Sequence, residues 1–370
     1  MPSDPDTLPL VVLQVVRPAA GGIRQHVLSL VQTIDPAQAT HSIAAPATFL
    51  HNLPPSQAQQ HPLEIAARFA PVSDLRAARR LARLVPSADI IHAHGLRAGW
   101  IAALAHVMRP FPFVLTAHNI ATHGTFARLA VRAIARRAQA IIAVSQAVAD
   151  SLVTLGAPPD KIVVIPNGVD TEHFAHLPTQ TEARTFLGIA PDTYVLGCIA
   201  RLSPEKGVDT LIQAAADLPD ISVLIAGDGP QRDTLQAALT PNVLLLGRIP
   251  DTRPLLAAID ALVIPSRMEG QGIVALEAMA AHVPIIASRV GGLAEMLSDN
   301  NTALLVPPFD PDALARAITR LRADPALQAH LIDNAVRLVH TRYTLPRTIA
   351  AIADVYVAVA ASAPLRPPRL

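Results

Sequence analysis

Apolar residues along the chain fall into short continuous runs separated by segments with helical spacing. The runs occupy 10–16, 88–93, 113–117, 140–144 and 162–165 in the first half, and 194–200, 221–226, 243–246, 261–264 and 283–287 in the second. Val, Ile and Leu at consecutive positions are typical of parallel strands covered on both faces. Helical patterns lie between many of these runs, as at 23–34, 209–216 and 311–323. The alternation predicts two doubly wound α/β domains.

The chain length of 370 residues agrees with two domains of ordinary size. We expect an N-terminal domain at 1–170 and a C-terminal domain at 171–344, joined by a linker around 166–180. An amphipathic helix at 345–362 is expected to pack back on the N-terminal domain. The polar segment 51–62 has the composition of a surface loop.

Composition limits the function classes. The net charge is +1, divided into about +5 over 1–170 and −4 over the rest, which is too weak a basic bias to indicate nucleic-acid binding. The single cysteine, Cys198, excludes an intramolecular disulfide and is predicted to be buried. The N-terminus is unlike a signal peptide and no apolar run is long enough to span a membrane. We expect a soluble cytoplasmic protein, with peripheral contact at the inner face of a membrane left open.

The segment from Glu269 to Glu277 is the most informative one for chemistry. A strand-like run ends at Pro265, a glycine-containing turn follows, and a helix is expected from about Ile273. This order directs backbone N–H groups and the positive end of a helix dipole at one point, which suits a phosphate. We expect Glu277 about two turns into the helix, where it can reach hydroxyls beside that phosphate. A phosphate next to a polyol describes a sugar nucleotide.

A second loop supplies positive charge. Arg201 and Lys206 follow the strand predicted at 194–200. Lys206 is one of only two lysines, so 28 of the 30 basic residues are arginine. A lysine retained in a Pro/Gly loop is a candidate point charge for a diphosphate, although a solvated loop lysine is the alternative.

Several other residues are weaker candidates. Gly21-Gly22 closes the first strand–helix turn without forming a dinucleotide-binding fingerprint, which counts against a nicotinamide dehydrogenase. His118 directly follows a predicted strand and is expected at the sheet edge where ligands bind. Of His92 and His94 we expect one packed and one facing the ligand crevice, because no third histidine or carboxylate has a spacing that matches a metal site.

Two patterns have competing interpretations. Asp310 and Asp312 have the Asp-x-Asp spacing of a divalent-cation site, but Asp310 before a proline is better interpreted as a helix N-cap, and no metal is predicted. The arginines at 128, 132, 136 and 137 are expected on one helix face, either solvated or as an anionic-acceptor or membrane surface.

Taken together, these motifs resemble those of family-4 retaining glycosyltransferases, the "glycosyl transferase group 1" type with the GT-B fold. The resemblance covers most of the chain. It includes Gly21-Gly22 with His26, His92-Ala-His94, Thr116-Ala-His118, Ser145, Asn167-Gly-Val-Asp170, Arg201 with Lys206, Gly227-Asp-Gly-Pro, Glu269 with Glu277, and Gly292 with Glu295. It implies two Rossmann-like domains facing a central cleft, with the acceptor bound by the first and a nucleoside-diphosphate sugar by the second.

The resemblance also implies residue roles. The residues carrying the reaction would be His118, Arg201, Lys206 and Glu269. The donor would contact Gly22, Arg201, Lys206, Gly270, Gln271, Gly272, Ile273 and Glu277, with Glu277 on the ribose. His26, His94 and Asn119 would lie on the acceptor side. No metal and no cofactor other than the donor substrate is implied. This chain departs from the family at Gln271, where an aromatic residue is usual, and at His282 and Ala303, where glycine is usual.

The predicted reaction is metal-independent transfer, with retention, from a nucleoside-diphosphate sugar to a saccharide, lipid-linked or glycolipid acceptor. Two alternatives remain open at this point. One is a sugar-nucleotide 2-epimerase of the same fold, and the other is a non-catalytic sugar-nucleotide-binding partner in polysaccharide assembly.

Overall fold

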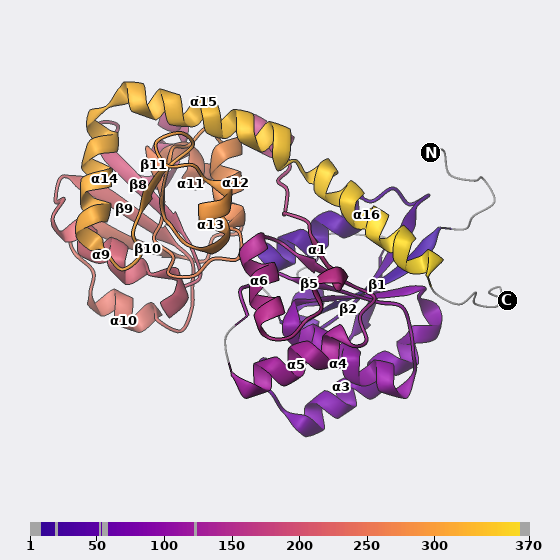
Figure 1. The fold of residues 1–370 in the computed structure, drawn as a ribbon. Helices are drawn as coiled ribbons and strands as arrows, with labels where there is room; N and C mark the ends of the chain where they lie inside the picture. The colour runs from indigo at the N-terminus through magenta and orange to yellow at the C-terminus, as the bar shows by residue number, and fades with distance from the viewer. Residues whose placement is uncertain (1–8, 19–20, 52, 54–57, 122–123, 363–370) are drawn as a thin grey trace. The chain divides into compact units, whose positions relative to one another are not determined.

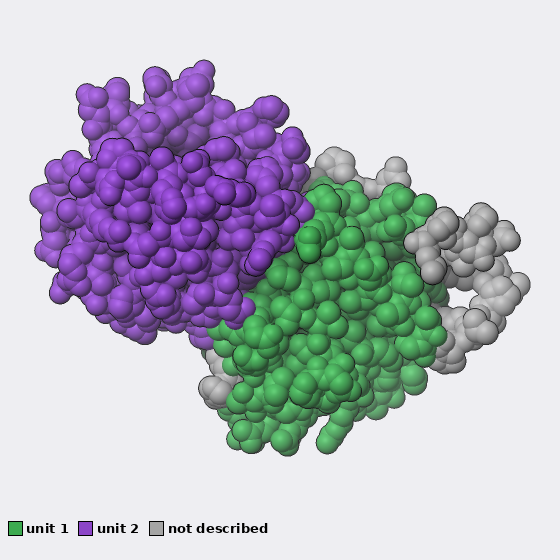
Figure 2. Space-filling model, turned by 45° about the horizontal axis from the view of Figure 1, so that its top comes forward, with its two compact units in different colours: residues 1–166, 346–370 green, residues 167–345 purple. Residues whose placement is uncertain are grey.

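The computed structural model describes residues 9–18, 21–51, 53, 58–121 and 124–362, and these form two compact units. Unit 1 comprises residues 1–166 together with 346–370, and unit 2 comprises 167–345 (Figures 1 and 2). The unit boundary after residue 166 falls within the linker expected around 166–180.

Unit 1 is built on one parallel sheet of seven strands. Its order is β3-β2-β1-β4-β5-β6-β7, so the direction of winding reverses between β1 and β4. The strands are β1 Leu10–Val16, β2 Ala39–Ala45, β3 Gln59–Pro62, β4 Ile90–His94, β5 Phe113–Ala117, β6 Ala140–Ala143 and β7 Ile162–Val164. Ligands bind at such reversals, outside the carboxyl ends of the strands.

Helices cover both faces of this sheet (Figure 1). They are α1 Gly22–Thr33, α2 Ala47–Leu50, α3 Pro71–Leu84, α4 Gly95–Met108, α5 Thr125–Ala135, α6 Gln146–Thr154 and α16 Leu345–Ala361. Leu13, Ile91 and Leu115 point into the core beneath α3, α4 and α5. The alternate residues of the same strands face the opposite side, because successive side chains of a strand point to opposite faces. That opposite side carries the functional side chains described below.

The C-terminal helix α16 belongs to unit 1 although it follows unit 2 in the sequence. Ile352, Tyr356 and Val359 are buried along it. The Tyr356 hydroxyl contacts side chains of β1 and β4, at 3.2 Å from Gln14 Nε2 and 2.7 Å from His92 Nδ1. The helix therefore packs on the N-terminal sheet.

Unit 2 has a second parallel sheet, in the order β10-β9-β8-β11-β12-β13. Its strands are β8 Tyr194–Ile199, β9 Ile221–Ala226, β10 Val243–Gly247, β11 Ala261–Ile264, β12 Ile285–Ser288 and β13 Leu304–Val306. The winding reverses between β8 and β11, which are adjacent in the sheet. The loops after these two strands contain Arg201, Lys206 and Glu269, so the predicted donor residues lie at the position where this fold binds ligands.

The helices of unit 2 lie on both faces of its sheet (Figure 1). They are α7 Thr171–Ala175, α8 Gln180–Leu187, α9 Val208–Ala216, α10 Arg232–Ala237, α11 Arg253–Ala258, α12 Ile273–Ala280, α13 Gly291–Met296, α14 Pro311–Ala323 and α15 Pro325–Arg342. One core packs α11, α12 and α15 against the sheet, and a second packs α9 and α14 against it.

Three local predictions need correction. Residues 59–62 form β3 rather than loop, because pairing with β2 supplies the backbone hydrogen bonds that composition alone does not reveal. Helix α5 ends at Ala135, so Arg128 and Arg132 lie on it whereas Arg136 and Arg137 follow its end. Glu277 is the fifth residue of α12, about one turn into the helix rather than two, since α12 begins at Ile273.

Candidate functional site

The candidate donor site of unit 2 is formed by the loops that follow β8 and β11. The backbone N–H of Arg267 donates to the Glu205 carbonyl oxygen at 2.8 Å, so the two loops are joined directly. Helix α12 starts after Gly272, whose φ of 88° favours glycine. Among the described residues, no side chain caps this helix and no acidic residue lies in its first turn. Its N-terminal N–H groups and dipole therefore suit an anion.

The glycine loop between Glu269 and Gly272 is held by close backbone contact with α13. A Cβ atom placed on Gly292 would lie 2.0 Å from the Gly270 carbonyl oxygen, so only glycine fits at position 292. The Gly292 N–H also donates to the Glu269 carbonyl oxygen at 3.1 Å. This contact fixes the path of the loop that leads into α12.

Lys206 and Glu269 form the central ion pair of unit 2. Lys206 Nζ lies 2.6 Å from Glu269 Oε2, and the Ser266 hydroxyl donates to the same oxygen at 3.1 Å. The Lys206 side chain is 25% exposed and that of Glu269 11%. From the family resemblance, Lys206 was expected to bind the diphosphate and Glu269 the sugar hydroxyls. The fold brings the charged groups of these two residues into contact.

Arg201 adds a second positive charge to the Lys206 loop, and its side chain is exposed. Burial raises the pKa of Glu205, but hydrogen bonds and the cations of Arg201 and Lys206 lower it, so that the pKa lies below its ordinary value. The cations of this loop thus help to stabilise the negative charge of a neighbouring carboxylate.

Two buried polar residues of α12 and its preceding loop have partners within unit 2. Glu277 is buried, and its Oε2 lies 3.3 Å from the Thr252 hydroxyl. Gln271 Oε1 accepts from the backbone N–H of Asn167 at 2.7 Å and from its Nδ2 at 2.8 Å, while Gln271 Nε2 donates to the Asn167 carbonyl oxygen at 3.1 Å. Gln271 thus fastens the glycine loop to the first residue of unit 2, a role that its sequence position did not indicate.

In unit 1, the predicted histidines gather on one face of the sheet. His92 and His94 alternate along β4, and Thr116 and His118 alternate along β5 and its end, so all four face the same side. His94 pairs in register with Thr116. His92 and His94 are fully buried and His118 is 8% exposed. Both side chains are thus packed within unit 1, and the expectation that one of them faces the ligand crevice stays a prediction.

A chain of hydrogen bonds connects these histidines to α16. Gln14 Nε2 lies 3.0 Å from His41 Nδ1 and 3.2 Å from the Tyr356 hydroxyl, and Gln14 Oε1 lies 2.6 Å from His94 Nε2. An amide oxygen only accepts, so the hydrogen of the neutral His94 ring is on Nε2 and its Nδ1 carries a lone pair. His92 bridges Tyr356 to Thr116 with two contacts of 2.7 Å.

Burial governs the charge of this network. It lowers the pKa of His41 to about 4 and keeps the pKa values of His92, His94 and His118 well below the ordinary value. Repulsion from neighbouring histidines lowers the last three further. These four rings are neutral at neutral pH and act as hydrogen-bonding groups rather than cations.

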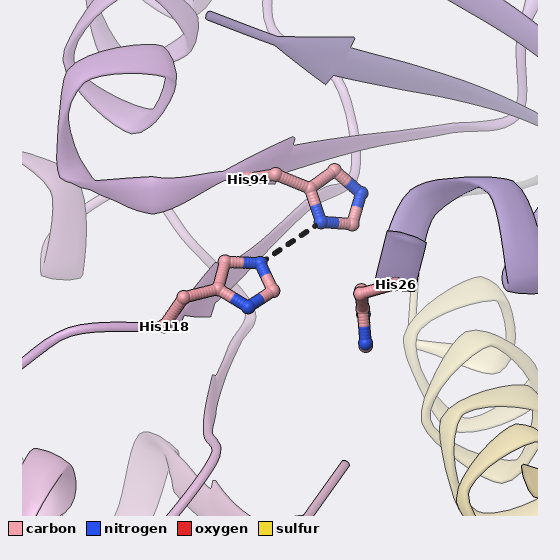
Figure 3. Close-up of side chains that lie close together, drawn as sticks. All are labelled: His26, His94 and His118. Carbon is pink, nitrogen blue, oxygen red and sulfur yellow. Dashed lines mark hydrogen bonds between the residues drawn. The ribbon is translucent and has the colours of Figure 1, made fainter. Parts of the chain in front are cut away.

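His26 comes from α1 and completes a group of three with His94 and His118 (Figure 3). His94 Nδ1 lies 3.4 Å from His118 Nε2. The His26 ring stands edge-on to both, with ring centroids 5.5 Å from His94 and 4.8 Å from His118. Sequence spacing could not reveal this group because its members come from α1, the last residue of β4 and the residue after β5.

The remaining candidates lie as follows. Gly22 is the first residue of α1, after β1 at the reversal of the unit 1 sheet, and Asn119 is exposed beside His118. Asp310 Oδ1 accepts from the Ala313 N–H at 2.8 Å, which confirms the N-cap. Cys198 is buried as predicted.

Comparison with known proteins identifies the class that this fold and its loops define. The model of "Glycosyl transferases group 1" matches residues 179–337, and that of "Glycosyltransferase Family 4" matches residues 20–173. The crystal structure of Anabaena Alr3699/HepE in complex with UDP and glucose superimposes with a TM-score of 0.86 at 24% identity, covering 94% of this chain and 100% of that one. The structural likeness establishes a fold of two Rossmann-like α/β domains, the architecture of the GT-B glycosyltransferases.

Sequence relatives establish the family. The D-inositol 3-phosphate glycosyltransferase of Streptomyces bingchenggensis is 33% identical over 301 residues, which are 72% of this chain and 66% of that protein. An uncharacterized glycosyltransferase of Methanocaldococcus jannaschii, MJ1607, is 30% identical over 72% of this chain and 75% of its own length. The chain thus spans about two thirds to three quarters of these relatives. It belongs to the family-4, group 1 glycosyltransferases, which are transferases of sugars.

Proposed function

We propose that this protein transfers a sugar from a nucleoside-diphosphate sugar, with UDP as the nucleotide, to a hydroxyl of a saccharide, lipid-linked or glycolipid acceptor. The observation that carries the proposal is the Lys206–Glu269 pair beside the N-terminus of α12. It combines a cation for a diphosphate with a carboxylate for sugar hydroxyls. The choice of UDP is supported by Anabaena HepE, whose structures contain UDP or UDP-glucose.

In the proposed site, each residue has a role that follows from its chemistry. Arg201 and Lys206 stabilise the negative charge that grows on the diphosphate as the glycosyl bond breaks, and the amide groups at Ile273 add to this without a metal. Glu269 and the backbone of Gly270 and Gly272 hold donor-sugar hydroxyls. Glu277 accepts hydrogen bonds from the ribose. Gln271 acts through its backbone, because its side chain is bonded to Asn167.

We propose that unit 1 serves the acceptor side with Gly22, His26, His94, His118 and Asn119. Transfer with retention then proceeds by attack of the acceptor oxygen on the face that the diphosphate leaves. The C1–O bond to the acceptor forms as the C1–O bond to phosphate breaks, and a leaving phosphate oxygen takes the acceptor proton. Neutral His118 suits hydrogen bonding to a hydroxyl there, since burial keeps its pKa well below the ordinary value.

Product analysis tests this proposal. The protein is incubated with UDP-, GDP- and ADP-sugars and a panel of acceptors that includes inositol phosphates, and the product is examined by NMR. We expect an α-linked product from an α-linked UDP-sugar. An inverted anomeric centre would contradict retention. Conversion of the donor without an acceptor would favour an epimerase, and binding without turnover on any acceptor would favour a non-catalytic partner.

An exposed aromatic group in unit 1 supports peripheral contact with a membrane. Phe69, Phe126 and Leu129 are each at least half exposed, and the Phe69 and Phe126 rings lie 4.7 Å apart. Arg128 and Arg132 lie on the same helix, α5, as Phe126. Aromatic side chains beside arginines suit the surface of an anionic bilayer. No helix among the described residues is long and apolar enough to cross a membrane.

Vesicle sedimentation tests this contact. Wild-type protein is expected to sediment with vesicles containing phosphatidylglycerol, and the double variant Phe69→Ser/Phe126→Ser to remain in the supernatant. Equal sedimentation of both proteins would show that this aromatic group does not bind lipid. The substitution Phe186→Ser is the control, because Phe186 is also exposed, at 78%, but lies in unit 2.

A further inference from the structure

The group formed by His26, His94 and His118 brings a side chain of α1 next to the carboxyl ends of β4 and β5 (Figure 3). All three side chains are at most 8% exposed. Their ligand atoms lie within 4.8 Å of one another, and among the described residues no other group of three potential ligands comes this close. Three imidazoles with a remaining open position are the ligand set of a four-coordinate zinc site.

The separation of two of these nitrogens fits tetrahedral coordination. Two ligands at about 2.05 Å from a tetrahedral zinc ion are roughly 3.3 Å apart. His94 Nδ1 and His118 Nε2 are separated by 3.4 Å. The ligand nitrogen of His26 lies within 4.8 Å of the other two, so it has to move by roughly 1.5 Å to reach the tetrahedral spacing. Rotation of the His26 side chain supplies this movement.

Hydrogen bonds around His94 prepare its Nδ1 for a cation. Its Nε2 is bonded at 2.6 Å to Gln14 Oε1, and Gln14 is itself held by Tyr356 of α16. Metal-binding histidines characteristically donate their other ring N–H to such an outer partner, which fixes the tautomer and the ring orientation. Gln14 therefore orients the His94 lone pair toward His118 and away from the sheet.

We propose that His26, His94 and His118 bind one Zn²⁺ or Co²⁺ ion, with the fourth position open to water. The ligand set determines the class of metal. Imidazole nitrogens suit Zn²⁺, Co²⁺, Ni²⁺ and Cu²⁺, whereas Mg²⁺ and Ca²⁺ require oxygen ligands and are not bound here. All three ligands belong to unit 1, whereas Arg201, Lys206 and Glu269 belong to unit 2.

The consequence for activity is inhibition. A metal ion at this site occupies the His118 nitrogen that the proposed reaction uses for hydrogen bonding, so Zn²⁺ slows transfer and a chelator does not. This consequence rests on the proposed function. Metal binding does not rest on it, and it is measured on the 370-residue chain without donor or acceptor.

The test titrates tag-free protein with Co²⁺ and follows visible absorption, with Zn²⁺ binding measured in parallel by calorimetry. The wild type is expected to bind one equivalent with the intense bands of four-coordinate Co²⁺, and Mg²⁺ to give no heat. Loss of a residue that is hydrogen-bonded to a metal ligand weakens metal binding by roughly 10- to 100-fold. His26→Gln and His118→Gln each remove a ligand itself, so each is expected to weaken Co²⁺ binding by at least this factor. His106→Gln is the matched control, since His106 lies on α4 in the same unit outside the group.

Both His26→Gln and His118→Gln proteins are first compared with wild type by the fluorescence of Trp100, the single tryptophan of the chain, which lies in unit 1. A variant that fails this comparison is replaced by His→Asn at the same position. Absence of stoichiometric binding to the wild type would overturn the proposal. Unchanged Co²⁺ spectra and affinity in both folded variants would overturn it as well, because the ion would then lie elsewhere.

Discussion

Removal of the Lys206 charge tests the physical basis of the unit 2 site. The change is Lys206→Met, which keeps the aliphatic stem but leaves Glu269 without its cation at 2.6 Å. Opposite charges about 4 Å apart attract by roughly 4 kcal/mol at an effective dielectric constant of about 20. Desolvation cancels part of this attraction. Exposed pairs contribute about 0.2–1 kcal/mol, whereas loss of one partner of a buried pair costs about 3–5 kcal/mol.

The Lys206–Glu269 pair lies between these limits because the lysine is 25% exposed and the glutamate 11%. We therefore expect Lys206→Met to lower the free energy of unfolding of unit 2 by about 2 kcal/mol. In the double variant Lys206→Met/Glu269→Gln the unpaired charge is gone, so part of the stability returns. The double-mutant cycle is expected to give a coupling energy of about 1–3 kcal/mol.

The assay is hydrogen exchange with mass spectrometry in increasing urea, followed on peptides from 194–288. The fluorescence of Trp100 is unsuitable because that residue lies in unit 1. Lys161→Met is the matched control: Lys161 is the other lysine, and its Nζ donates to the carbonyl oxygens of Ala135 and Ala138 at 2.9 Å within unit 1. It should leave the exchange of unit 2 unchanged. Additive effects of the two unit 2 substitutions, with a coupling energy below about 0.5 kcal/mol, would show that the two charges do not stabilise each other.

Three further predictions concern the hydrogen-bond network of unit 1 and the glycine loop. Burial lowers the pKa of His41 from 6.5 to about 4, so between these pH values the unfolded chain binds more protons than the folded one. The free energy of unfolding therefore falls as the pH drops below 6.5. His41 alone accounts for a loss of up to about 3 kcal/mol at pH 4. Urea unfolding followed by Trp100 fluorescence at pH 7.5 and 5.0 measures this, and equal midpoints would contradict it. Tyr356→Phe removes the hydroxyl bonded to His92 and should destabilise unit 1 by about 1–3 kcal/mol in the same assay, whereas an unchanged midpoint would show that the bond contributes nothing. Gly292→Ala places a Cβ atom 2.0 Å from the Gly270 carbonyl oxygen and so displaces the glycine loop. The affinity for a UDP-sugar, measured by calorimetry, should fall at least tenfold. A wild-type affinity would mean that the loop is not part of the donor site.

The sheets and several helices were predictable because their signals are local. Val/Ile/Leu runs marked most strands, and the bounds predicted for 311–323 agree with those of α14 because Asp310 and Pro311 begin that helix with an N-cap and a proline. Strand β3 was missed because its sequence, Gln-Gln-His-Pro, has no strand pattern and forms only by pairing with β2.

The sequence offers the residues of the candidate site but not the contacts between them. Glu269 and Lys206 are 63 residues apart, and their ion pair exists because β8 and β11 are neighbours in the sheet. The group of three histidines depends in the same way on the order of β1, β4 and β5, which no spacing along the chain contains. An unusual residue such as Gln271 signalled a departure from the family, whereas its bonds to Asn167 became visible only in the fold.

Isothermal titration of the purified protein with UDP-glucose measures whether the Lys206 loop and the N-terminus of α12 bind the diphosphate of a sugar nucleotide. We expect the wild type and Lys161→Met to bind one equivalent, and Lys206→Met to bind at least tenfold more weakly. Equal affinity of Lys206→Met and wild type, or no association with UDP-, GDP- or ADP-sugars at all, would contradict it.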